Sequence, residues 1–350
     1  WSNLGDSMRI TIKNLLASLV LSFAASFAFA QGAAPVAKAQ VESVNILEVN
    51  KDVQAQREKA ENQPANNQPI WKSANSDQAH YVSIPNKEAG VLIQKSGQQW
   101  RLIRNGVITV WGGWLIVIMA GLILTVFVVK GKIKLHEPMT GRLMKRFSGL
   151  ERFSHWLMAF SFIALAITGL LILFGKHFLL PIMGGTAYGA LLLVMKNIHN
   201  FTGPLFTASI LLFFVIFVKD NLPSKDDLYW LATFGGLLSG KHIPSHRFNA
   251  GEKIWFWAGV TILGMVVSGS GWVLDMIVPN MEYWRGTMQL ANIIHGVAAI
   301  LMTVMAMGHI YVGSIGMEGA LQGMKTGYVD EAWGKEHHEL WYNDVKSGKL

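Results

Sequence analysis

The chain has 350 residues, of which 51% are hydrophobic and only 15% are charged, and its formal net charge is +8. A composition this apolar, with 35 Gly, 16 Met and 13 Trp, is typical of an integral membrane protein and excludes an ordinary soluble domain. Cysteine is absent, so this chain alone forms no disulfide, no c-type haem attachment and no iron–sulfur cluster. The basic residues gather beside the apolar segments rather than in a nucleic-acid-binding motif, which argues against a nucleic-acid partner.

The amino-terminal segment has the pattern of an exported chain. Residues 1–30 are expected to be a signal peptide, with 1–7 preceding the true start, because Arg9 and Lys13 precede an apolar run that closes in Ala-Phe-Ala. A retained anchor helix is the alternative, although the apolar run is short for a span. Residues 31–106 are expected to form an exported region, disordered at first and then containing short β-leaning runs, YVSIP, GVLIQ and QWRLI.

Apolar segments of membrane-spanning length follow, at 109–130, 151–174, 196–218, 254–278 and 288–314. Seven Lys and Arg residues lie from 130 to 152 and five from 219 to 253, against two from 175 to 196 and one from 275 to 289. Loops rich in Lys and Arg face the cytoplasm. The mature amino terminus is therefore expected outside the membrane, and the tail at 317–350 in the cytoplasm.

Histidines stand near the ends of the later apolar segments, at His155, His199, His295 and His309. The last two share a segment and are fourteen residues apart, which is nearly four helical turns and about 21 Å of rise, so they face the same way at different depths. The predicted topology places His155 and His309 near the cytoplasmic surface, and His199 and His295 near the outer surface. An ionisable side chain inside a span indicates function.

Pairs of facing histidines at matched depths predict two haem groups. Two axial imidazoles hold a six-coordinate iron with no open position, which suits electron transfer. An interhelical hydrogen bond is the simpler explanation for any single histidine, whereas four at matched depths favour haem. Gly169, Gly203 and Gly296 lie near the outer ligands and would make room either for a macrocycle or for close helix packing. Arg152 and Lys196, each three residues before a histidine, are expected to be propionate counter-charges or plain interfacial cations.

Several stretches together resemble the cytochrome b, or gamma, subunit of membrane-bound formate dehydrogenase. They cover roughly residues 150–342 and are ERFSHW (151–156), NIHNFTGP (197–204), RFNAGEK (247–253), IIHGVAAI (293–300), MGHIY (307–311) and GKEHHELWY (334–342). The resemblance implies a fold of four helices, here within 150–316, that holds two b haems through the four histidines already selected. The expected fold class is thus an all-α integral membrane protein, a four-helix di-haem bundle preceded by one extra transmembrane helix and a small exported region.

The resemblance also implies a quinone site, for menaquinone or ubiquinone, at the turn formed by Asn249, Ala250 and Gly251. Asn249 could bond a quinone carbonyl, His309 could contact the quinone through its second ring nitrogen, and Glu252 is a candidate proton donor. An ordinary turn, with Asn249 as a helix N-cap, is the alternative reading of these residues.

The partners implied by the resemblance are an iron–sulfur (beta) subunit and a molybdenum- or tungsten-pterin catalytic (alpha) subunit outside the bacterial cytoplasmic (inner) membrane, within a possible higher oligomer. This chain alone would not oxidise formate. Two alternatives remain open at this point. The same scaffold could serve a nickel–iron hydrogenase or a thiosulfate reductase, or the chain could be a haem-free proton-coupled transporter, against which it shows no internal repeat. The remaining histidines, His337 and His338 among them, are expected at the surface.

Overall fold

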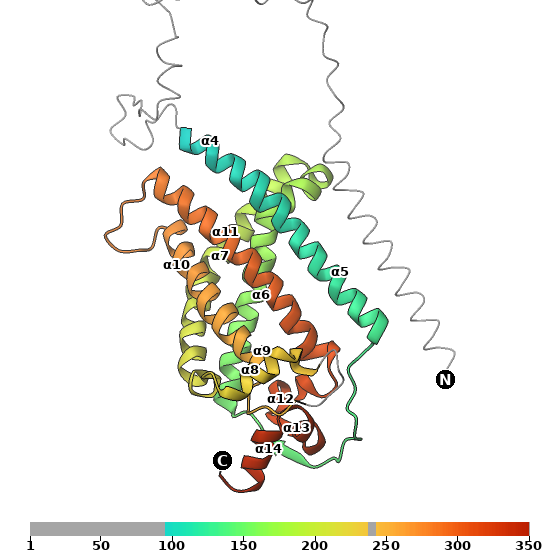
Figure 1. Ribbon diagram of the computed structural model, residues 1–350. Helices are drawn as coiled ribbons and strands as arrows, with labels where there is room; N and C mark the ends of the chain where they lie inside the picture. Colours follow the sequence, from blue (N-terminus) through green and yellow to red (C-terminus); the bar gives the residue numbers. More distant parts are fainter. Residues whose placement is uncertain (1–94, 237–242, 350) are drawn as a thin grey trace, which may run out of the picture.

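Long helices dominate the computed structural model, which describes residues 95–236 and 243–349 (Figure 1). Within these described residues, five helical stretches are long and apolar enough to cross a membrane: Ser96–Lys130, Gly149–Phe178, Leu180–Phe217, Ala250–Leu274 and Arg285–Gly316. The predicted all-α membrane class is therefore confirmed for the described residues. The predicted signal peptide at 1–30 and the exported region up to residue 94 lie outside the described residues.

The first long helix begins well before the predicted residue 109. Helix α4 (Lys95–Leu102), the π-helical segment η1 (Ile103–Trp111) and helix α5 (Gly112–Lys130) follow one another without a break. The prediction of a β-leaning run in QWRLI is wrong, because these residues are helical. Tertiary contacts outweigh local β propensity here: Trp100 Nε1 donates a hydrogen bond to Asn292 Oδ1 at 3.1 Å, which ties the segment to a neighbouring helix.

Four further helices form a bundle, and α4 and α5 run along one side of it (Figure 1). Its members, in chain order, are α6 (Gly149–Phe178), α7 (Leu180–Phe217), the continuous run α9 (Ala250–Ile254), η4 (Trp255–Leu263) and α10 (Gly264–Leu274), and finally α11 (Arg285–Tyr311) with its π-helical extension η5 (Val312–Gly316). Helix α6 packs along α7, and α10 packs against both α7 and α11. Helix α5 packs against α11 so closely that a side chain at position 112 would overlap Ile300, and Gly112 avoids this clash.

Local sequence fixes where two of these helices begin. Ser148 and Glu151 form a capping box at the start of α6, with Ser148 N donating to Glu151 Oε2 at 2.6 Å. Asn249 and Glu252 form a second box at the start of α9. Such reciprocal bonds satisfy backbone N–H groups that the first helical turn leaves unpaired. The first box consequently sets His155 about two turns inside α6.

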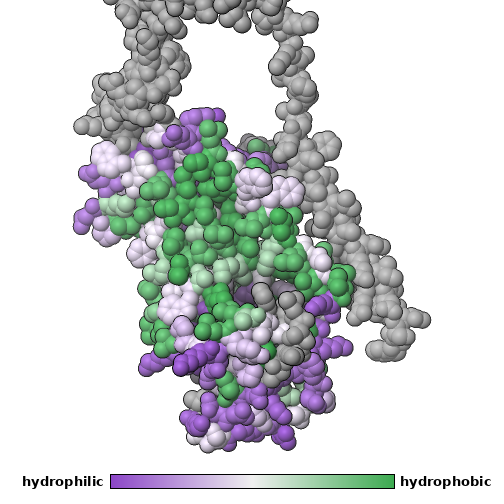
Figure 2. Space-filling model, in the orientation of Figure 1, coloured by the Kyte–Doolittle hydropathy of each residue, from purple (hydrophilic) through white to green (hydrophobic). Residues whose placement is uncertain are grey.

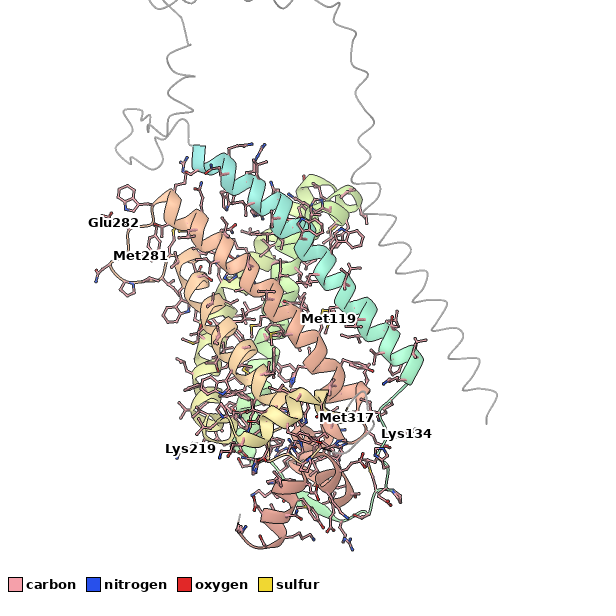
Figure 3. All side chains as sticks on the ribbon, viewed as in Figure 1. Met119, Lys134, Lys219, Met281, Glu282 and Met317 are labelled. Atoms are coloured by element: carbon pink, nitrogen blue, oxygen red, sulfur yellow. The ribbon has the colours of Figure 1, made fainter. Side chains whose placement is uncertain are left out.

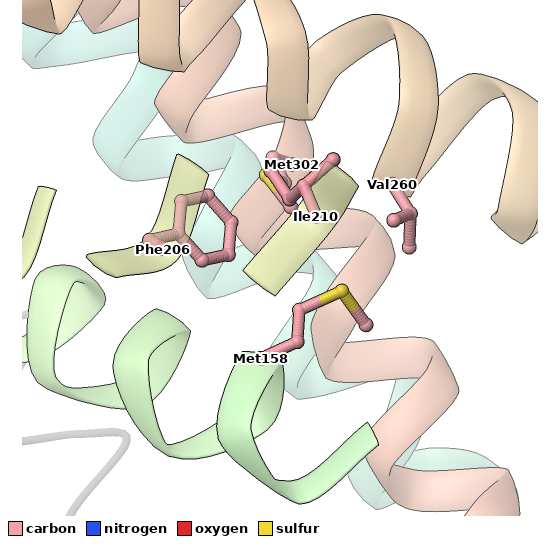
Figure 4. Close-up of a cluster of buried hydrophobic side chains, with 5 residues drawn as sticks. All are labelled: Met158, Phe206, Ile210, Val260 and Met302. Carbon is pink, nitrogen blue, oxygen red and sulfur yellow. The ribbon is translucent and has the colours of Figure 1, made fainter. Parts of the chain in front are cut away.

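The centre of the bundle is a cluster of buried apolar side chains, Met158, Phe206, Ile210, Val260 and Met302 (Figure 4). They come from four different helical runs, and each is at most 6% exposed. Met302 lies midway between His295 and His309 on α11, so this dry core separates the two levels at which histidines occur. It also closes off the interior between them to bulk water.

The outer surface of the bundle is apolar and its two ends are polar. Figure 2 shows hydrophobic side chains over the middle of the molecule and hydrophilic ones at both ends. Phe201 and Val215 are 83% and 73% exposed, which suits contact with lipid tails. Lys134 and Lys219 lie at the end where the chain terminates, and Glu282 lies at the opposite end (Figure 3). The basic loops thus share one end of the bundle.

A small folded unit covers the basic end. Strand β1 (Leu143–Lys145) pairs antiparallel with β2 (Tyr328–Asp330), with Met144 opposite Val329. Helices α12 (Ala320–Thr326), α13 (Glu331–His337) and α14 (Glu339–Lys346) pack around this pair. The loop before α9 adds a 3₁₀ turn η2 (Lys219–Asn221), helix α8 (Lys225–Ala232) and a 3₁₀ turn η3 (Phe234–Gly236). The predicted cytoplasmic tail is therefore docked onto the inter-helix loops.

Candidate functional site

The structure brings together the same two histidine pairs that the sequence predicted. His155 on α6 faces His309 on α11, with 6.3 Å between their ring centroids. His199 on α7 faces His295 on α11, with 6.0 Å between ring centroids. We call these the inner pair and the outer pair, respectively.

The outer pair is held in one tautomer by hydrogen bonds at Nδ1. His199 Nδ1 lies 2.8 Å from Thr168 Oγ1, and the Thr168 hydroxyl donates its single hydrogen to the Ala164 carbonyl at 2.7 Å. The hydroxyl therefore accepts from His199 Nδ1–H. His295 Nδ1 lies 3.1 Å from the carbonyl oxygen of Val267, which can only accept. Both rings consequently keep the Nε2 lone pair available for a metal ion.

A hydroxyl–glycine dipeptide stands beside each outer histidine. A Cβ on Gly169 would lie 3.3 Å from His199 Cε1, and a Cβ on Gly271 would lie 3.3 Å from His295 Cε1. The preceding residues are Thr168 and Ser270, and Ser270 Oγ is 3.2 Å from His295 Nδ1. Gly169 thus makes room for the imidazole ring, where the sequence had suggested room for a macrocycle or a neighbouring helix.

A cavity of about 390 Å³ adjoins the outer pair. Its walls are mainly apolar side chains of α6, α7, α10 and α11. Gly203 and Gly296, which the sequence placed near the outer ligands, also line it. Ile108 of η1 closes one side, so the first long helix belongs to the wall. Two cations, Arg104 and Lys196, also line it. The lining also contains one carboxylate, Asp275, which accepts a hydrogen bond from Asn200. An apolar cavity with two cations in its wall can take a flat cofactor that carries acidic groups.

The inner pair has aromatic surroundings in place of hydroxyl groups. The His309 ring stacks on Trp255, with 5.0 Å between centroids and 17° between planes. His155 contacts Trp156 edge-on, with 5.2 Å between ring centroids. Its Nδ1 is buried and has no hydrogen-bond partner among the described residues. A buried polar atom without a partner is rare in folded proteins, and it distinguishes the inner pair from the outer pair, where both Nδ1 atoms are hydrogen-bonded.

The short helix α9 separates the turn at Asn249 from Trp255, the residue that stacks on His309 of the inner pair. Asn249 Oδ1 accepts from Glu252 N at 3.0 Å, so Asn249 is a helix N-cap. A Cβ on Gly251 would lie 2.9 Å from the Trp230 ring, which shows how closely α8 approaches the turn. The cap occupies the amide oxygen and leaves the Asn249 NH₂ group as a possible donor to a carbonyl.

Arg146 and His338 form a buried polar cluster beside this turn. His338 is 1% exposed, so its predicted surface position is wrong. Its Nδ1 donates to the His246 carbonyl at 2.7 Å, and its Nε2 accepts from Arg146 Nη2 at 3.0 Å. Arg146 also reaches Glu252 Oε1 at 3.2 Å. Burial lowers the pKa of Arg146, and Glu252 opposes that effect. The carboxyl-terminal unit is thereby linked to the turn.

Arg152 lies at the same end of the bundle, three residues before His155. Its Nη1 donates to the carbonyl oxygen of Lys325 at 3.0 Å, and its Nε is buried without a partner among the described residues. Arg152 therefore bonds the backbone of α12 and lies about one helical turn from His155 on α6.

Both histidine pairs fit a metal ion held between imidazoles. Ring centroids 6.0 and 6.3 Å apart leave room for one ion between the two nearer nitrogens, each at about 2 Å. Residues 146–327, which include all four histidines, match the family described as prokaryotic cytochrome b561. The chain belongs to this cytochrome b561 family. As a cytochrome b it binds haem b, and the predicted family resemblance is confirmed.

Similar proteins carry more specific names. The formate dehydrogenase cytochrome b556(fdo) subunit of Escherichia coli K12 is 29% identical over 212 residues, 57% of this chain and 92% of that protein. The nitrate-inducible cytochrome b556(Fdn) subunit of the same strain is 26% identical over 221 residues, 59% of this chain and 94% of that protein. The formate dehydrogenase cytochrome b556 subunit of Haemophilus influenzae is 24% identical over 208 residues, 57% of this chain and 82% of that protein.

Four neighbours of the histidine pairs in this cytochrome were missed by the sequence reasoning. They are Thr168, Ser270, Trp255 and Arg104. The hydroxyl–glycine dipeptides at 168–169 and 270–271 gave no specific signal, because the same kind of dipeptide recurs elsewhere in the chain, for example at 148–149 and 202–203. Trp255 and Arg104 gave no signal either, since their roles depend on how separate helices pack.

Proposed function

We propose that this chain is the membrane subunit of a formate dehydrogenase and carries electrons from an exported partner through two haem b groups to quinone. The observation that carries the proposal is the double histidine pair, 6.0 and 6.3 Å between centroids, in a cytochrome b family member. Relatives named as formate dehydrogenase cytochrome b556 subunits support the donor enzyme.

In this proposal His155 and His309 hold one haem b, and His199 and His295 hold the other. When bound, haem b would supply reversible one-electron transfer, and two histidines per haem would leave its iron no free position for a further ligand. The side chains of this chain position each ring, and the apolar cluster of Figure 4 keeps water from the space between the two levels.

Cations near each level are proposed to neutralise haem propionates. At the outer level Arg104 and Lys196 line the cavity, and both can reach an acidic group there. At the inner level Arg152 is the candidate, and its buried Nε is the atom that lacks a partner among the described residues. Arg104 would give the first long helix a direct part in binding.

The quinone is proposed to bind at the turn of Asn249 and Gly251, beside the inner pair. Asn249 can donate its NH₂ group to a quinone carbonyl, because the cap uses only its Oδ1. Trp255, which lies six residues after Asn249 in the same helical run, stacks on His309. This contact links the turn to the inner histidine pair. Glu252, which is about one third exposed, could pass a proton from water to the reduced quinone.

The proposed orientation puts the basic end of the bundle in the cytoplasm. The loops that hold Lys134 and Lys219 and the docked carboxyl-terminal unit share that end (Figure 3). The outer pair then faces an exported iron–sulfur subunit, which in turn receives electrons from a pterin-containing subunit that oxidises formate. Electrons moving inward while protons are taken up inside would build a membrane potential in the bacterial inner membrane.

The test is a reduced-minus-oxidised spectrum of the purified complex with haem counted per chain. We expect two b haems, and one in the His199→Ala or His309→Ala variant, with formate-driven quinone reduction abolished in both. His177→Ala is the matched control, because His177 is exposed at the end of α6 and should leave both haems in place. Two haems retained in His199→Ala would contradict the ligand assignment. Activity with hydrogen or thiosulfate in place of formate would contradict the donor.

A further inference from the structure

The two histidine pairs differ in what their second ring nitrogen does. In the outer pair both Nδ1 atoms are hydrogen-bonded, His199 to Thr168 at 2.8 Å and His295 to the Val267 carbonyl at 3.1 Å. In the inner pair His155 Nδ1 has no partner among the described residues, and His309 stacks on Trp255. The same kind of residue therefore stands in two chemical environments.

We propose that these hydrogen bonds make the outer pair the site of lower reduction potential, with Thr168 and Ser270 as its positioning residues. The inference rests on the proposed function, because it assumes that the four histidines are the axial ligands. It goes further by assigning an order of potentials to the two levels and by naming side chains that set it.

The hydroxyl groups act as fixed acceptors. Thr168 donates its only hydrogen to the Ala164 carbonyl, and Ser270 donates to the Val266 carbonyl at 2.6 Å. Neither hydroxyl can turn to donate toward the imidazole without breaking that bond. Each therefore presents a lone pair to an Nδ1–H group of the outer pair.

An imidazole that donates from Nδ1 is a more basic ligand at Nε2. A more basic ligand stabilises the more positively charged, oxidised iron and so lowers the reduction potential of its site. At the inner level, His155 gains no such electron density from the described residues. Electrons supplied outside by an iron–sulfur partner and consumed inside by a quinone, together with two protons, would then move toward the higher potential.

Gly169 and Gly271 make this arrangement specific. Each lies directly after the hydroxyl residue and leaves 3.3 Å between a notional Cβ and the Cε1 of its histidine. Each imidazole can therefore approach the neighbouring helix closely enough to reach the hydroxyl on it. The same hydroxyl–glycine arrangement thus occurs on α6 beside His199 and on α10 beside His295.

The experiment is a potentiometric titration of the two haem components in the intact complex, followed by visible absorbance. In Thr168→Val the lower component should rise by about a tenfold change in its reduction equilibrium constant, which is 59 mV for one electron. Ser270→Ala should raise the same component by less, because the Val267 carbonyl bond to His295 remains. Thr168→Ser should restore the original value, since it returns the hydroxyl.

Thr125→Val on α5 is the matched control. Thr125 also donates its hydroxyl to a carbonyl of its own helix, that of Gly121 at 2.8 Å, and it does not line the cavity, so both midpoints should stay in place. Movement of the higher component in Thr168→Val, or an unmoved lower component in both hydroxyl variants that retain haem, would overturn the inference. A complex without two low-spin b haems per chain would instead overturn the proposed function.

Discussion

Gly169 offers the sharpest test of how the outer histidine is held. An alanine at this position would put Cβ 3.3 Å from His199 Cε1 and 3.8 Å from its Nδ1, so the ring must give by a few tenths of an ångström. The Thr168 hydroxyl, 2.8 Å from the same ring, resists that movement. The substitution therefore strains the ligand rather than the helix.

Opposing effects make the expected change in folding free energy small. Replacing Gly by Ala inside a helix stabilises it by about 0.8–1 kcal/mol, whereas overpacking a filled site costs about 1–3 kcal/mol. We expect Gly169→Ala to change the free energy of unfolding by no more than about 2 kcal/mol. Displacing a group that orients a metal ligand typically weakens metal binding about 10–100-fold, so the outer site should lose haem first.

The assay combines haem per chain by pyridine haemochrome with a thermal melt followed by circular dichroism. Gly169→Ala should lower outer haem occupancy with little change in melting temperature, and Gly169→Val should reduce the count to one. Gly121→Ala on α5 is the control, because no atom lies within 4 Å of its notional Cβ. Two haems with an unchanged spectrum in Gly169→Val would refute the reasoning.

Three further outcomes are expected. Asn249→Asp keeps the N-cap but loses the NH₂ donor, so KM for quinone should rise with an unchanged melting temperature; an unchanged KM would leave Asn249 as a cap alone. Hydrogen bonds from Lys346, Tyr342 and Arg142 lower the pKa of Glu331 from 4.5 to about 2. The stability that the ionised Glu331 gives to the docked carboxyl-terminal unit is therefore full above pH 4.5 and is lost as the pH falls toward 2. Tryptophan fluorescence should report that loss, and a Glu331→Gln variant that keeps the same acid midpoint would contradict it. Ile210→Ala, at 1% exposure in the central cluster, should cost about 2–5 kcal/mol of unfolding free energy by chemical denaturation, whereas exposed Val215→Ala should cost under about 1 kcal/mol.

Helix periodicity explains why the histidine pairs could be predicted from the sequence. His295 and His309 must share a face because their spacing is close to four turns, and the loop charges assign His155 and His199 to opposite depths. Depth and face together leave one sensible pairing. The resemblance to the formate dehydrogenase subunit added the turn of Asn249, which local sequence alone reads as a helix cap.

Local propensity failed where tertiary contacts outweigh it. QWRLI favours β structure by composition, yet it is helical because Trp100 bonds Asn292 and the segment lies along α11. His338 looked like a surface residue in a polar tail, yet it is buried between Arg146 and the His246 carbonyl. Neither partner is near His338 in the chain, so only folding could reveal that contact.

The sequence by itself determined the membrane class, the helical stretches and the histidines at two depths, because these follow from hydropathy and a fixed helical rise. The tertiary structure decided what surrounds each ring: the Thr168 hydroxyl at His199, the Trp255 face at His309 and the Arg104 side chain at the outer cavity. Such contacts depend on the rotation and approach of whole helices, which small residues such as Gly112 permit, and no local rule of spacing encodes that.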